Sequence, residues 1–198
     1  MSDKCINLED IDHSLGCDGN VSGIVPEVIF GYHEDAAAWP DEPAPTITGG
    51  TTTPLSLEEA GALDGDVVMK AGTKAFKLAF TEDVGNFTIT TDGEVDGLSV
   101  IMTLTIVKAK ISKKILGFIN AAINRKMFFI VQDENGVRYL MGGKRRGCKF
   151  VSGGDGSSTG TTSSDRNQTT LQFTYRSGKA LVYEGDTETL LVAAPVTP

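Results

Sequence analysis

The sequence predicts a mainly β protein with one long helix and long polar loops. Apolar and polar residues alternate in several short segments, which is the pattern of half-buried strands. Only residues 112–126, SKKILGFINAAINRK, place apolar residues at helical spacing over several turns. The chain has 23 glycines in 198 residues and few aromatic residues, which fits many turns between short strands. We expect a single domain, 1–198, because this length suits one hydrophobic core.

The first third of the chain is polar and is expected to contain little regular structure. Residues 1–23 are acidic without a clear period and predict an N-terminal arm. The segment 24–30, IVPEVIF, predicts a strand with Pro26 at its start or at a sheet edge. Residues 33–65 are rich in Pro, Gly, Thr and acid, so they predict a long loop. A loop of this length either makes subunit contacts or contains a strand near TITGGT.

Three strands are predicted before the helix. KAFKLAF at 74–80 alternates, and NFTITT at 86–91 follows it. LSVIMTLTIVKAK at 98–110 is the longest run and has apolar residues on both faces. It is therefore expected to be a central strand that is covered on both sides.

The helix is expected to be a packing element and not a binding site. Ser112 is suited to cap its N-terminus. Four of its residues follow helical spacing and are expected to face the core: Ile115, Ile119, Ala122 and Ile123.

The last third predicts a hairpin, a polar loop and two strands. Asn135-Gly136 within MFFIVQDENGVRYLMG predicts a hairpin turn with both residues at positive φ. Residues 152–167 form a Gly/Ser/Thr-rich loop with little apolar surface, which we expect to be mobile in a free subunit and ordered on assembly. The segment 170–176, TLQFTYR, predicts a half-exposed strand, or one whose polar face lines a water-filled channel. A last strand is expected around KALVYEG.

Charge and composition exclude several classes of protein. The net charge of −8 argues against a DNA-binding surface, which needs clustered cations. No apolar run approaches the roughly 20 residues that cross a bilayer, and the first residues show no signal-peptide core, so we expect no membrane contact and a cytoplasmic origin. The three cysteines are odd in number and far apart, which gives no disulfide framework.

No residue pattern predicts catalysis. The sequence lacks GxSxG, HExxH and Walker motifs, and the GGDGSSTG run has no lysine to hold a phosphate. His13 and His33 could be combined with Cys5 and Cys17 as a zinc site, but their spacings match no zinc knuckle. We therefore expect no enzyme, no cofactor and no metal.

One cationic cluster is predicted at the end of the hairpin. It is either a solvated turn or a subunit contact that meets acid on a neighbour, supplied by the N-terminal arm or by Glu34–Glu42. The candidate residues for subunit contacts, including three from the polar loop, are Arg138, Lys144, Arg145, Arg146, Lys149, Asp155, Asp165 and Arg166.

The second half of the chain, roughly 98–186, resembles the tail tube (major tail) proteins of long-tailed phages and prophages. NGVRYLMGGKRRG is similar to a hairpin common in phage virion proteins. SSTGTTSSDRNQTTLQFTY is similar to a stretch in tail structural proteins from phages of gut bacteria, and KALVYEGD fits the same pattern. The first 65 residues lie outside this resemblance.

The resemblance implies a β-sandwich or barrel with one helix across its flank, and loops and terminal arms that link subunits. It implies a structural virion protein that forms stacked rings, through which DNA passes without specific binding. Its partners would be further copies, a tape measure protein and a tail terminator. Its location would be the virion tail, after synthesis in the cytoplasm of a bacterial host. A lumen that is neutral or acidic would let DNA slide, because like charges repel phosphate.

Three alternatives remain at this point. The chain could be a tail terminator, a head–tail connector or a capsid-decorating protein. It could be an extracellular β-sandwich that binds carbohydrate, although Trp39, its only tryptophan, lies in a Pro-rich segment. An enzyme is the third alternative.

Overall fold

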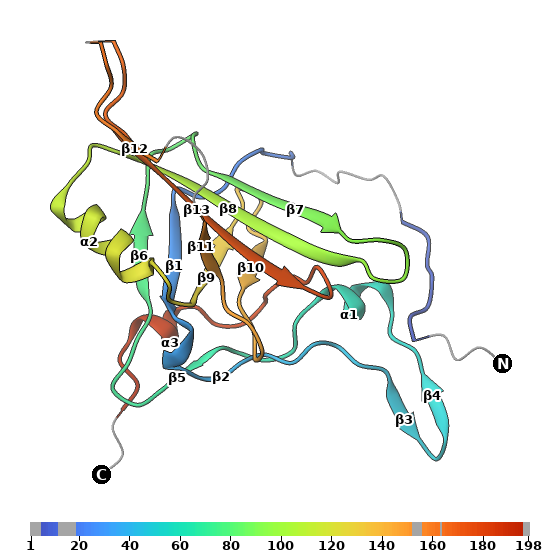
Figure 1. The fold of residues 1–198 in the computed structure, drawn as a ribbon. Helices are drawn as coiled ribbons and strands as arrows, with labels where there is room; N and C mark the ends of the chain where they lie inside the picture. The colour runs from blue at the N-terminus through green and yellow to red at the C-terminus, as the bar shows by residue number, and fades with distance from the viewer. Residues whose placement is uncertain (1–4, 12–18, 152–155, 163, 196–198) are drawn as a thin grey trace.

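The chain is mainly β and has two antiparallel sheets at its centre (Figure 1). The structure is a computed structural model, which describes residues 5–11, 19–151, 156–162 and 164–195. Sheet 1 has the order β10 (Arg138–Met141), β9 (Met127–Gln132), β1 (Glu27–Tyr32) and β6 (Phe76–Ala79). Sheet 2 has the order β11 (Lys149–Val151), β13 (Gln168–Ser177), β8 (Ser99–Ala109) and β7 (Asn86–Asp92), and β12 (Ser157–Ser158) pairs with β13.

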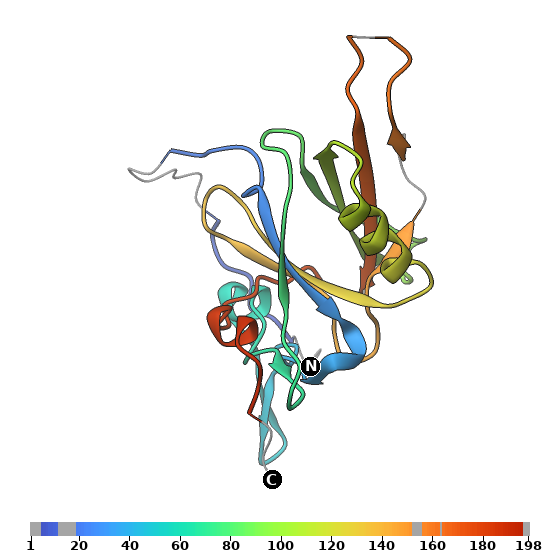
Figure 2. The same ribbon diagram turned by 90° about the vertical axis from the view of Figure 1, so that its left-hand side faces the viewer.

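Smaller elements surround these two sheets. Two short pairs of strands are β2 (Ala36–Ala38) with β5 (Val68–Met69), and β3 (Thr46–Thr48) with β4 (Thr51–Thr53). The helices are η1 (His33–Asp35), α1 (Leu57–Gly61), α2 (Lys113–Ala122) and α3 (Glu188–Leu191). The β3–β4 hairpin stands away from both sheets in each view (Figures 1 and 2).

The main core lies between the two sheets. Phe129 of β9 and Phe173 of β13 are fully buried, and their ring centroids are 4.4 Å apart. Helix α2 covers one side of this core, where Phe118 meets both Phe30 and Phe173. Further buried members of this cluster are Val28, Met102, Leu104, Ile106, Ile115, Ala122, Val131, Met141 and Leu171. The flanking helix is thus part of the core, as the sequence predicts.

Sheet 1 is covered on its second face as well. Phe128 and Ile130 of β9 point away from sheet 2 into a second cluster. This cluster includes Val67, Ala75, Tyr183 and Leu190, which come from segments around β5 and α3. Five successive residues of β9 are therefore buried, which is typical of a strand enclosed on both sides.

The expectation that β8 is covered on both sides is wrong. β8 is central in sheet 2, but only one face is fully buried, through Met102, Leu104 and Ile106. Its other face is partly exposed and carries Thr103 and Thr105. The apolar residues Ile101 and Val107 on that face gave the sequence its two-sided pattern.

Helix α2 is shorter than predicted. Ser112 caps it, since its Oγ accepts a hydrogen bond from the Ile115 N–H at 3.3 Å. The helix ends at Ala122 because Asn124 adopts a left-handed φ of 60°. Ile119 is half-buried, but Ile123 is 46% exposed, so its predicted place in the core is wrong.

The predicted hairpin is confirmed, but its turn differs. The turn residue Gly136 has a φ of 86°, whereas Asn135 does not have a positive φ. Asp133 Oδ1 accepts hydrogen bonds from the N–H groups of Asn135 (3.0 Å) and Val137 (2.8 Å), and its carbonyl accepts from Gly136 N–H. The aspartate thus lengthens the loop beyond the two-residue turn that Asn-Gly predicts.

The less regular segments give two outcomes. Residues 33–65 contain the β3–β4 hairpin at TITGGT, which confirms the alternative of a strand there, and they also contain β2 and α1, which Ser56 and Glu59 cap reciprocally. KALVYEG does not form a regular strand. Val182 makes only isolated pairings with Ala62 and Tyr139.

Substitutions in and directly after α2 should show that the buried isoleucine contributes more to the free energy of unfolding than the exposed one. Ile115→Ala should lower the free energy of unfolding by about 2–5 kcal/mol, because it removes buried methyl groups and leaves a cavity. Ile123→Ala, the matched control, should change it by less than about 0.5 kcal/mol. Urea denaturation with an unchanged slope would measure both values, and equal effects would contradict this packing of the helix.

Candidate functional site

A groove with a cationic rim lies between the ends of the two sheets. It has a volume of about 810 Å³ and is formed by the turn after β10, the end of β13 and the segment Pro40–Glu42. Pro40 and Leu63, both half-buried, make its lining partly apolar. We call it the basic groove, after the cations that line it: Lys144, Arg145, Arg146, Arg176 and Lys179.

The turn that carries three of these cations is tightly closed. Gly143 and Arg146 each donate a backbone N–H to the carbonyl of the other, at 2.9 and 3.2 Å, so Lys144 and Arg145 occupy the tip. Gly142 precedes the turn with a φ of 154°, and a Cβ there would lie 2.8 Å from Cβ of Phe128. Only glycine lets the chain leave β10 so close to the core.

His33 and Trp39 connect this turn to the core of sheet 1. His33 Nε2 donates a hydrogen bond to the Gly143 carbonyl at 2.7 Å, because a carbonyl oxygen can only accept. The His33 ring stacks on Trp39 with centroids 4.8 Å apart, and Trp39 meets Phe128 edge-on at 5.6 Å. The position of the cations is thus set by a chain of contacts that ends in a buried aromatic ring.

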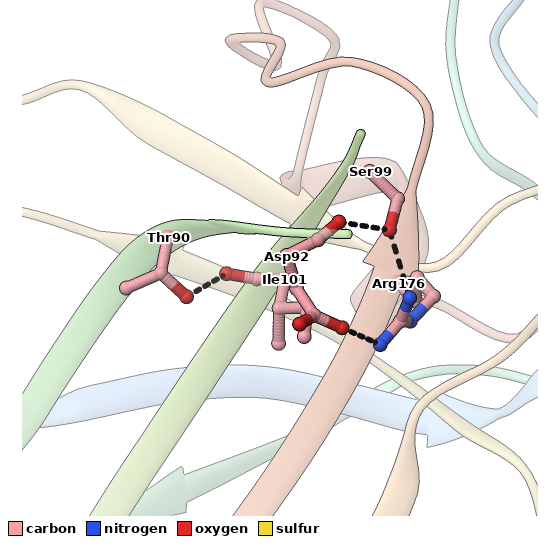
Figure 3. A network of polar contacts seen from close by, with 5 residues as sticks. All are labelled: Thr90, Asp92, Ser99, Ile101 and Arg176. Carbon is pink, nitrogen blue, oxygen red and sulfur yellow. Dashed lines mark hydrogen bonds and ion pairs between the residues drawn. The ribbon is translucent and has the colours of Figure 1, made fainter. Parts of the chain in front are cut away.

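The opposite wall is fixed by a polar network at the end of sheet 2 (Figure 3). Arg176 donates to Ser99 Oγ at 2.8 Å and forms an ion pair with Asp92. Ser99 Oγ in turn donates to the Asp92 carbonyl at 3.2 Å. Thr90 Oγ1 donates to the Ile101 carbonyl at 3.4 Å. An exposed pair of this kind stabilises the fold by only about 0–1 kcal/mol, so its main effect is to orient Arg176 beside the groove.

The charges of the groove are not balanced. Arg176 is paired with Asp92, and Lys179 lies 3.8 Å from Glu42 and donates to the Pro43 carbonyl. By contrast, the three cations of the turn 143–146 are exposed and form no ion pair with any residue in the described part of the chain. The turn therefore presents unpaired positive charge to an anionic group.

Tyr175 lies beneath the turn. A Cβ at Gly143 would be 2.9 Å from its hydroxyl oxygen, which shows how closely the turn covers it. Burial raises the pKa of Tyr175 above its usual value, and a hydrogen bond with Ser177 opposes that effect.

The structure divides the predicted cationic cluster. Lys144, Arg145 and Arg146 lie together, but at the end of the hairpin opposite its turn at 133–137. Arg138 lies outside the groove lining: its guanidinium is 6.0 Å from the Tyr183 ring centroid and donates to the Glu184 carbonyl. Lys149 is exposed at the start of β11 and does not line the groove either.

The candidates from the polar loop lie elsewhere. Asp165 Oδ2 accepts three hydrogen bonds of 2.8 Å from Thr161 and Thr162, which lower the pKa of its carboxyl group to about 2. Arg166 lines a small cavity of about 200 Å³ with Thr81, before the start of β13, whereas the groove is at the end of that strand. Asp155 lies outside the described residues.

Metal binding finds no support in the described ranges, where no three His, Cys, Asp or Glu side chains gather in a way that could hold an ion. Cys148 is buried, which raises the pKa of its thiol well above the usual value, and its Sγ donates to the Met141 carbonyl. His13 and Cys17 lie outside the described residues. Of the described helices, none has the length and apolar character needed to span a bilayer.

Sequence patterns did not identify the second wall of the groove or its anchor. Arg176 and Lys179 are scattered cations, and Asp41 and Glu42, expected to meet a neighbouring copy, line the groove of their own chain. In the sequence, His33 was considered only as part of a zinc pattern whose spacings match no zinc knuckle. Its contact with Gly143 spans 110 residues, so no local pattern could reveal it.

Comparison with known proteins gives no match among family models, curated proteins or solved structures. The surface of the molecule is therefore the source from which its function can be inferred. The basic groove and the exposed strands are its most distinctive features.

The anchor can be tested by His33→Ala. Loss of a hydrogen bond worth about 1 kcal/mol should accelerate hydrogen exchange at the Arg146 amide roughly fivefold. The amides of β9 serve as an internal control and should keep their protection. Equal acceleration throughout sheet 1 would mean general destabilisation and would contradict a local anchor.

Proposed function

We propose that the chain is a structural virion protein that polymerises into stacked rings and forms the tube of a phage tail, through which DNA passes. The observation that carries this proposal is the exposed edge strand β7 of sheet 2, which flanks a well-packed core. Its partners would be further copies, with a tape measure protein and a tail terminator at the ends of the tube. The resemblance of residues 98–186 to tail tube proteins supports the same function.

The β3–β4 hairpin projects from the two sheets (Figures 1 and 2). It is almost fully exposed and includes Ile47. Such a projecting segment is expected in a subunit that orders its arms against neighbours.

The free edge of sheet 2 also favours association. β7 is a seven-residue edge strand and is exposed over nearly its whole length, including Ile89. The unpaired N–H and C=O groups of an edge strand are a template for pairing with another chain. A head-to-tail contact of this kind between copies would generate rings or filaments.

The outer face of sheet 2 is suited to a DNA conduit. Its centre carries hydroxyl and amide side chains together with Ile101 and Val107, and its charged residues Arg176 and Asp92 pair with each other at one end of the sheet, so the centre offers little attraction to phosphate. The register places these polar residues on one face: Asn86, Thr88, Thr90, Thr103, Thr105, Thr170, Gln172 and Thr174. This arrangement supports the channel-lining interpretation of the segment 170–176.

Size-exclusion chromatography with light scattering and negative-stain microscopy over a concentration series would test the proposal. Hollow tubes are the expected result. Single rings that never stack would instead favour a tail terminator. A strict monomer at high concentration would overturn the proposal.

Charge reversal on the turn of the basic groove should block assembly. The triple variant Lys144→Glu/Arg145→Glu/Arg146→Glu should remain folded, because these side chains are exposed, but should form no tubes. Circular dichroism would check folding and microscopy would check assembly. Lys110→Glu/Lys113→Glu/Lys114→Glu, a reversal of the same size outside the groove, should assemble. Normal tubes from the first variant would exclude the groove from the subunit contact.

A further inference from the structure

The basic groove combines positive charge with an apolar part of its lining. Within the described ranges, its turn carries three cations that form no ion pair, and the half-buried Pro40 and Leu63 give its lining an apolar part. An interface of this composition suits a segment with acidic and apolar side chains together. A phosphate backbone would satisfy only the cations and would leave the apolar part of the lining without a contact.

The described part of the N-terminal segment has the complementary composition. Leu8 is 85% exposed and Ile11 is 87% exposed, and the acidic residues Glu9 and Asp10 lie between them. Within the described ranges, neither carboxylate forms an ion pair. We call residues 8–11 the acidic segment.

The acidic segment projects from a fixed root. Just before it, the Asn7 N–H donates to the Leu55 carbonyl at 2.8 Å, and the Leu55 N–H donates to the Cys5 carbonyl at 3.0 Å. The four residues that follow lack regular structure and are exposed. The chain thus exposes two large apolar side chains and two carboxylates directly after the segment 5–7, which is held by backbone hydrogen bonds to Leu55.

We infer that the basic groove of one copy receives the acidic segment, Leu8–Ile11, of a second copy. In an extended segment of polyproline type, residues three apart share one side, so Leu8 and Ile11 face the apolar lining about 9 Å apart. Glu9 and Asp10 then face the rim, within reach of the turn 143–146. A volume of about 810 Å³ is within the range of sites that enclose ligands of this size.

The second copy follows from the position of the segment in this structure. The acidic segment of the same chain is exposed, and none of its residues lines the groove. A contact between two different surfaces of identical chains is heterologous and propagates head to tail. The inference rests on the proposed function in one respect, namely that copies of this chain associate. It specifies which two surfaces make the contact between them.

Disulfide trapping in the full-length chain would test the inference. Both partners carry Cys5→Ser and Cys17→Ser, which leaves the buried Cys148. One partner carries Asp10→Cys and the other Arg145→Cys, and the two are mixed under mild oxidation. The cross-linked product should exceed by about tenfold that of a matched pair, Asp10→Cys with Glu134→Cys. Glu134 is an equally exposed turn residue, but it lies at the opposite end of the hairpin.

Each outcome decides the inference. Equal yields from the two pairs would overturn it, even if the wild type forms tubes, and the proposed function would then stand alone. A chain that carries both cysteines and gives only an internal disulfide would also overturn it, because the occupant would be the same copy. Strong cross-linking without rings or tubes would support this contact and contradict the proposed function.

Discussion

The enclosure of β9 between two hydrophobic clusters is the constraint on which the rest of the structure depends. On one side Phe129 packs against Phe173 of sheet 2, and on the other Phe128 packs among residues near β5 and α3. Both layers must be in place to remove these rings from water, and burial of each large side chain contributes about 1.5–3 kcal/mol. Sheet 1 is thus a rigid centre, and segments far apart in the chain are required to complete it.

This constraint also explains where the charges lie. A strand that is buried on both faces can carry charged residues only at its ends, so the hairpin places Asp133 and Glu134 at one end and Lys144–Arg146 at the other. His33 and Trp39 connect the buried Phe128 ring to the turn 143–146, because His33 bonds to the Gly143 carbonyl and stacks on Trp39, which packs against Phe128. The chain thus has oppositely charged surfaces at the two ends of this hairpin, which is the property that the proposed head-to-tail assembly needs.

Sequence patterns predicted the elements that depend on local periodicity. The alternation in 170–176 predicted β13, the long run at 98–110 predicted β8, and Asn135-Gly136 predicted the hairpin. The burial of both faces of β9 was not predictable, because a short apolar run does not say what covers it. Only one wall of the groove could be predicted. Lys144–Arg146 are adjacent in the sequence, whereas the second wall forms only when β13 pairs with β8 in the observed register. Ile123 followed helical spacing, but the left-handed Asn124 ended the helix first.

The central claim is that this chain is a building block whose uncovered surfaces close against other copies. A three-dimensional reconstruction by electron microscopy of particles formed by the purified wild-type chain tests it most directly. The account predicts hollow stacked rings in which the two-sheet core is unchanged and the basic groove is filled by a neighbour. A closed compact oligomer without a channel, or a monomer with an empty groove at every concentration, would contradict it.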